Sequence, residues 1–273
     1  MIEIALCLAI IGFALVSILL VLPIGMNAQR DSRQETVIAQ DASMLLEAIR
    51  DGARGNDDLT NSVYAITVYW ENLATGQSGQ NNYTYTSASV SSSITYPNGP
   101  YSAAPLTNGA NIIGLLSTPE FIANINIPPY TNYPAVPDPY FAGLYGAGCY
   151  SNHVVAYVHS ISGLAAEKPP QDNQILQEDT FTYRLVCVNA PIPMDTNLYS
   201  SSLSQRSYGE NLAGNLREVR LLFMWPQLLN GNVGAFRQNF RATVAGQLAL
   251  TNAPPNPYPL YFYASQSFAT NAP

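Results

Sequence analysis

Few residues in this chain combine a chemically capable side chain with the spacing that catalysis requires. His153 and His159 are six residues apart on a predicted strand, so they share a face but lie roughly 20 Å apart, too far to share a metal ion. The glycine-rich run 143–148 is followed by no lysine and no helix pattern, which indicates a turn and not a phosphate cradle. Asp57 and Asp58 offer oxygen atoms to calcium, but solvated loop acids are the favoured interpretation. Because the sequence also lacks hydrolase, zinc-protease and redox motifs, we predict no enzymatic activity, no cofactor and no metal site.

The carboxylate in the most unusual position is Glu3, which stands directly before an apolar run. No charged side chain occurs from Ile4 to Ile24, and these 21 residues form a helix of about 30 Å, the thickness of a bilayer's hydrocarbon core. An acid deep in a membrane helix costs about 2.5–3.5 kcal/mol, so Glu3 needs a cationic partner. The nearest candidate is an N-terminal amine, that of Met1 in a neighbouring copy of the chain. The segment is therefore expected to serve assembly as well as anchoring.

An amphipathic helix is predicted to continue from the apolar run to Asp51. Ile38, Ala42, Leu45 and Ile49 recur at helical spacing and form its apolar face. The charged residues are placed outside this face: Arg30, Arg33, Glu35, Asp41, Glu47 and Arg50. Pro23 and Gly25 interrupt the helix pattern, so we expect a kink or an unwound stretch near Ser17–Gly25, and Asp51-Gly52 supplies the stop signal.

Beyond this stem the apolar pattern changes from a period of 3.6 residues to a period of two. The predicted strands cover residues 64–70, 82–86, 153–159, 180–188, 216–225 and 236–250. Residues 91–148 form a long, irregular but packed excursion with one short apolar piece, Ile112–Leu116, and the tail carries one more candidate strand at 260–263. We predict an α+β protein with two parts: a stem helix over residues 1–51, and a mainly antiparallel β-sheet domain with long loops over residues 52–273.

Composition limits the partners that this chain is expected to bind. Of the 273 residues only 11% are charged, and the net charge of −7 disfavours nucleic acid and acidic membrane surfaces. The chain holds 18 tyrosines and 20 prolines with many Asn, Ser and Thr residues, a composition that is common in exported β-rich proteins. Asn82 begins an Asn-Tyr-Thr sequon, but modification there is the less favoured interpretation.

The three cysteines divide between the two predicted parts. Cys7 lies in the apolar run and is expected to be a small buried hydrophobe. Cys149 and Cys187 are the only cysteines of the β-rich part, and outside the cytoplasm we expect them to form a disulfide. Its loop of about 37 residues would contribute roughly 3–4 kcal/mol. Two separate buried thiols are the alternative.

The N-terminal segment resembles that of type IV pilins and pseudopilins. The resemblance covers about the first 50 residues and rests on Ile2-Glu3, the long apolar helix, Gly12 nine residues after the glutamate, and Pro23. It implies a methylated structural subunit of an extracellular pilus, or fimbrium, that polymerises through its helix, with assembly residues Met1, Glu3, Gly12, Pro23 and Gly25. The implied partners are copies of the same chain, the inner-membrane pilus assembly machinery and a prepilin peptidase. The implied location is the inner membrane before assembly and a cell-surface filament afterwards.

Two other interpretations stay open at this point. One is a minor pseudopilin of a secretion or pilus machine, and the other is a monomeric membrane-anchored binding module. We do not expect a cleaved signal peptide, because the apolar run exceeds the ~7–15 residues of a signal's apolar region and no A-x-A site follows it. We expect either that the sequence begins near the mature terminus or that the true start lies upstream.

Overall fold

The computed structural model describes the chain in two compact units, Met1–Gln40 and Asp41–Pro273. The described residues are 2–52, 59–73, 76–84, 93–96, 99–102, 106, 108–123, 136–137, 149–162, 181–192, 215–228, 231–251 and 260–264.

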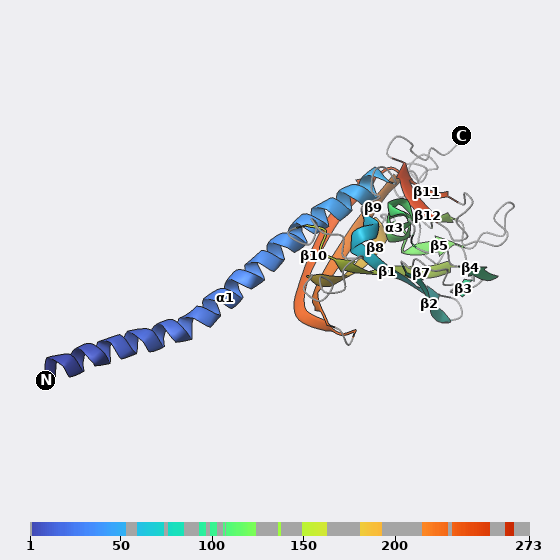
Figure 1. Ribbon diagram of the computed structural model, residues 1–273. Coiled ribbons are helices and arrows are strands. Elements are labelled where there is room, and N and C mark those ends of the chain that lie inside the picture. The colour runs from blue at the N-terminus through green and yellow to red at the C-terminus, as the bar shows by residue number, and fades with distance from the viewer. Residues whose placement is uncertain are drawn as a thin grey trace. The chain divides into compact units, whose positions relative to one another are not determined.

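Three helices are present in the described part of the chain: α1 (Ile2–Asp51), α2 (Leu59–Ser62) and α3 (Gly109–Leu116). The helical backbone of α1 continues through Pro23 and Gly25, so the prediction of an unwound stretch is wrong. One proline removes only one backbone donor, and the ladder on either side of it stays intact. Figure 1 shows a bend in the helix axis within its N-terminal half, in agreement with the alternative prediction of a kink. The helix ends as expected, because Gly52 adopts a φ of 75° that favours glycine.

The strands follow the period-two pattern that the sequence shows. In chain order they are β1 (Val63–Asn72), β2 (Ser78–Thr84), β3 (Ser93–Tyr96), β4 (Gly99–Ser102), β5 (Phe121–Ala123), β6 (Val136–Pro137), β7 (Cys149–His159), β8 (Thr182–Pro191), β9 (Leu216–Gln227), β10 (Val233–Ala245), β11 (Gln247–Thr251) and β12 (Leu260–Ala264). Two of the predicted boundaries are wrong. Strand β9 passes through Pro226, and the single strand expected over 236–250 is divided at Gly246, whose φ is 132°.

One antiparallel sheet forms the frame of the second unit (Figure 1). Its path runs β10-β9-β8-β7-β1-β2, and β5 and β6 extend it beside β7. Strand β8 pairs with residues 154–159 of β7, whereas β5 pairs with residues 149–151, so the two strands share one edge of β7. The pairs β11-β12 and β3-β4 form two further small sheets. A helix followed by a mainly antiparallel sheet confirms the α+β class.

One face of the large sheet is covered and the other is partly solvated, as is common for antiparallel sheets. The buried side chains of the covered face alternate along the central strands and include Ile66, Val68, Val154, Ala156, Val158, Leu185, Val219, Leu221 and Phe223. The buried apolar side chains of the covering elements include Ala42, Leu45, Ala48 and Ile49 from the end of α1, Leu59 from α2, and Ile112, Ile113, Leu115 and Leu116 from α3.

Helix α3 approaches β12 closely through a glycine. A Cβ atom built on Gly114 would lie 2.9 Å from Leu260 Cβ and 2.9 Å from the Phe262 ring. The helix begins at Asn108, whose side-chain oxygen accepts a hydrogen bond from the Asn111 amide at 2.8 Å. The short apolar piece at Ile112–Leu116 is therefore helical, one of the two forms that its composition allowed.

Candidate functional site

The most exposed apolar surface in the described residues is the first half of α1. Ile2 is 84% exposed and Phe13 is 78% exposed, and apolar side chains point outward on every side of the helix. The segment Ile2–Leu19 is the one described helix that is long and apolar enough to cross a membrane, and none of its residues is buried within the chain. A helix that is apolar all round is typical of a membrane span or of a helix covered by other helices.

The predicted assembly residues are placed along this exposed helix. Glu3 is exposed in the first turn, where a carboxylate also interacts favourably with the helix dipole. Gly12 and Gly25 stand in open positions, since a Cβ atom added to either would meet no other atom within 4 Å. Pro23 is helical, its side chain lies outside the described residues, and Met1 also lies outside them. No contact within the described chain requires either glycine.

Asp41, near the other end of α1, lies buried in the second unit. Its carboxylate accepts hydrogen bonds from the backbone N–H of Ile161 at 3.0 Å, from the N–H of Ser162 at 2.8 Å and from the Tyr183 hydroxyl at 3.0 Å. The prediction that Asp41 lies outside the buried face is wrong. Its spacing of four residues before Leu45 and eight before Ile49 is the signal that places it there.

Burial raises the pKa values of both Asp41 and Tyr183. Desolvation raises the pKa of the Asp41 carboxyl, and the hydrogen bonds from Ser162, Ile161 and Tyr183 oppose that rise only in part. The pKa of Tyr183 lies well above its usual value, because the phenol is buried and the Asp41 carboxylate lies beside it. Tyr183 is therefore protonated near neutral pH and can donate its hydrogen bond to Asp41. The arrangement is a structural link between α1 and the sheet.

The predicted disulfide between Cys149 and Cys187 is wrong, because Cys187 carries a free thiol. Cys187 pairs across the sheet with Val154, five residues along β7 from Cys149, which pairs instead with Ala123 of β5. Five residues of strand span about 16 Å, far beyond the roughly 7 Å that a disulfide allows between Cα atoms. The Cys187 thiol donates a hydrogen bond to the Leu116 carbonyl at 3.2 Å, and burial raises its pKa to about 12.

The histidines take the ordinary positions that the sequence favours. His153 stacks on Tyr69 with ring centroids 4.9 Å apart, and His159 lies 4.7 Å from the Tyr64 ring. Partial burial lowers the pKa of both histidines, which keeps them neutral near pH 7. No group of three or more potential metal-binding side chains occurs among the described residues.

Asn82 is exposed on β2, and its side-chain oxygen accepts a hydrogen bond from the Thr67 hydroxyl at 2.9 Å.

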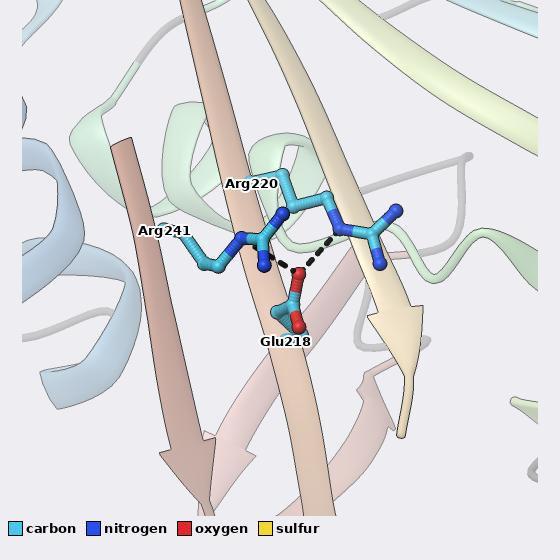
Figure 2. Close-up of polar contacts among 3 residues, drawn as sticks. All are labelled: Glu218, Arg220 and Arg241. Atoms are coloured by element: carbon cyan, nitrogen blue, oxygen red, sulfur yellow. Dashed lines mark hydrogen bonds and ion pairs between the residues drawn. The ribbon is translucent and has the colours of Figure 1, made fainter. Parts of the chain in front are cut away.

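A small cluster of charges lies on the solvated face of β9 and β10. Figure 2 shows Glu218 between Arg220 and Arg241. Its Oε1 atom lies 2.5 Å from Arg220 Nε and 3.2 Å from Arg241 Nε. The residue directly opposite Glu218 is Thr243, so the Arg241 contact is diagonal. The hydrogen bond from Arg220 lowers the pKa of the Glu218 carboxyl. Because both arginines are largely exposed, such a cluster contributes within about 0–1 kcal/mol and indicates no chemistry.

Comparison of the chain with protein-family models, with characterised proteins and with solved structures returns no match. Its function must therefore be argued from its own residues, and the exposed apolar half of α1 is the feature that most needs a functional explanation.

Proposed function

We propose that this protein is the structural subunit of an extracellular filament of the type IV pilus kind, polymerising through the N-terminal half of α1. The observation that carries the proposal is the exposure of thirteen large apolar side chains between Ile2 and Leu22. Covering a large aliphatic side chain is worth about 1.5–3 kcal/mol, so leaving this segment in water would cost on the order of 20 kcal/mol. The segment therefore needs a cover of lipid or of other helices.

A filament supplies such a cover after the chain leaves the membrane. In this proposal the α1 helices of many copies bundle together, and each copy resides in the inner membrane before assembly. The open surroundings of Gly12 support close helix–helix approach, because small residues allow helix backbones to come near each other in an apolar medium. The assembly machinery of the membrane and a prepilin peptidase are the partners that this route requires.

Glu3 has a specific part in the proposal. Its carboxylate is the one charged side chain among the first 29 residues, and a neighbouring copy's N-terminal amine would neutralise it. An ion pair that is removed from water needs both partners, since one unpaired charge in an apolar bundle is strongly destabilising. Assembly would thereby select one axial offset between adjacent chains.

The test is to replace Glu3 with glutamine in the native host and to measure filaments by electron microscopy with peptide identification. Glu35→Gln is the matched control, because Glu35 is exposed on the same helix outside the apolar segment. We expect Glu3→Gln to reduce the amount of filament that is recovered by shearing at least about tenfold, which corresponds to a loss of about 1.4 kcal/mol in assembly free energy. The level of the subunit in the membrane should stay unchanged. Glu35→Gln is expected to assemble normally.

Three results would separate the alternatives. If the chain dominates the filament mass, it is a major subunit, whereas a few copies per filament would identify a minor pseudopilin. If the chain is found only as a monomer in membranes, it is an anchored binding module and the filament proposal fails. Normal filaments with Glu3→Gln would remove the proposed role of Glu3.

A further inference from the structure

A cavity of about 430 Å³ lies on the solvated face of the large sheet, at one end of β1. This volume is within the ~300–1,000 Å³ range of small-molecule sites. Six of its lining side chains come from three adjacent strands and lie in two rows across the sheet. The first row is Gln80, Tyr69 and His153, and the second is Ser78, Glu71 and Ser151.

The strand register determines the dimensions of this surface. Adjacent strands are about 4.8 Å apart and alternate residues about 7 Å apart, so the six positions cover roughly 10 Å by 7 Å. A pyranose ring with its hydroxyl groups, or a disaccharide lying flat, has similar dimensions. Glu71, Ser78, Gln80 and His153 are exposed, and Tyr69 and Ser151 are half-buried, so a ligand can reach the polar groups from solvent.

The two rows differ in chemistry. In the first row, the Tyr69 and His153 rings stack with their centroids 4.9 Å apart and an angle of 9° between their planes, which makes a continuous aromatic pair. In the second row, Glu71 lies between Ser78 and Ser151 in the strand register. A carboxylate accepts hydrogen bonds from ligand hydroxyls, while serine hydroxyls and the Gln80 amide both donate and accept.

The charge of the lining selects among ligand classes. Glu71 is the only formally charged side chain that lines the cavity in the described part of the protein, and no lysine or arginine contributes to it. Phosphates and acidic sugars are therefore disfavoured. A simple amine would gain little from Glu71, because exposed ion pairs contribute only about 0–1 kcal/mol, and it would leave the serine and glutamine groups unused.

We infer that this cavity is a binding site for a neutral carbohydrate, whose apolar ring face packs against Tyr69 while its hydroxyls bond to Glu71, Ser78, Ser151 and Gln80. The inference does not depend on filament assembly, because the site lies within the second unit and is complete in one chain.

The experiment is calorimetric titration of the full-length chain in a detergent without a sugar headgroup. The neutral probes are cellobiose, maltose, lactose and chitobiose, and the contrasting probes are glucuronate and tetramethylammonium. We expect at least one neutral disaccharide to bind saturably and more tightly than either charged probe. Binding of none of the disaccharides, or tighter binding of a charged probe, would overturn the inference.

Variants then locate the site. Tyr69→Ala is expected to weaken binding of the best disaccharide at least about tenfold, and Glu71→Gln at least about threefold. Glu71→Gln keeps the shape of the side chain, so it serves if Tyr69→Ala does not fold. Tyr157→Ala is the matched control, because Tyr157 is a half-buried tyrosine of the same sheet face and does not line the cavity. Equal losses for Tyr69→Ala and Tyr157→Ala, or an unchanged affinity of Glu71→Gln, would contradict the assignment.

Discussion

Replacing Asp41 with alanine should destabilise the second unit by about 2–4 kcal/mol. The substitution leaves three donors without their acceptor: the amides of Ile161 and Ser162 and the hydroxyl of Tyr183. A buried donor left without a partner costs about 1–3 kcal/mol. Tyr183 is fully buried and bears the whole cost, whereas Ile161 and Ser162 are half-buried and water can replace part of their bonds.

The assay is urea unfolding of the full-length chain in detergent, followed by tryptophan fluorescence. The chain has two tryptophans, Trp70 in β1 and Trp225 in β9, so the signal reports on the sheet. The midpoint should fall with an unchanged dependence on denaturant, which indicates lost stability and not a changed unfolded state. Tyr183→Phe is the matched variant, expected to cost about 1 kcal/mol because it removes one hydrogen bond and little volume.

A double-mutant cycle tests the reasoning directly. If the Asp41–Tyr183 bond stabilises the unit, the double variant should be more stable than the sum of the single losses predicts, by at least about 0.5 kcal/mol. A coupling near zero, or a loss below about 0.5 kcal/mol for Asp41→Ala, would refute the argument.

The stability should also depend on pH through Asp41. Its folded pKa is raised above the ordinary value of 3.8 by burial, so the folded state binds the proton more tightly than the unfolded state does. This contribution is fully present below about pH 3.8 and is lost as the pH rises through the folded pKa. The unfolding free energy of the wild type minus that of Asp41→Asn should therefore fall as the pH rises from acidic to neutral. A rise of this quantity over the same range would show that the folded pKa is shifted in the opposite direction.

Two further predictions concern the packing around α3. Gly114→Ala should cost about 1–3 kcal/mol in the same urea assay, because its Cβ atom would lie 2.9 Å from Leu260 and from Phe262. Gly12→Ala is the control and should leave the urea midpoint unchanged, because its Cβ atom would meet no other side chain. Equal midpoints for Gly114→Ala and wild type would contradict the close approach of α3 to β12. The Cys187 thiol is buried and its pKa is raised to about 12, so it should not react with iodoacetamide in the folded protein but should react in urea. Peptide mass spectrometry measures the labelling of each cysteine separately. Rapid labelling of Cys187 in the native protein would contradict its burial.

Much of the secondary structure follows from local sequence patterns. The helix of α1, the stop at Gly52 and the cores of β1, β7, β8 and β9 were predicted, because each depends on a periodicity or a turn signal within about ten residues. The division of the last long strand at Gly246 was not predicted. A lone glycine in an alternating run does not show that the chain passes from β10 in the large sheet to β11 in a separate sheet.

The residues of the carbohydrate site show the same limit. Tyr69 was recognisable on a predicted strand over residues 64–70, and Glu71 directly follows that strand in the sequence. Their approach to Gln80 of β2 and to His153, some 80 residues further along the chain, is a matter of strand order and register. No local pattern encodes which strands become neighbours, so the cavity could not be predicted.

The sequence by itself determined that this protein has an apolar N-terminal helix with an acid at its tip and an antiparallel β-rich region, because side-chain periodicity alone specifies such elements. The tertiary structure decided what depends on long-range pairing. Opposite Cys187 it places Val154 and not Cys149, which excludes the disulfide. It also turns Asp41, one of several charges on a helix, into a buried acceptor for three donors that lie about 120 to 142 residues away in the chain. Both outcomes arise from the register and packing of strands, and these depend on the whole chain at once.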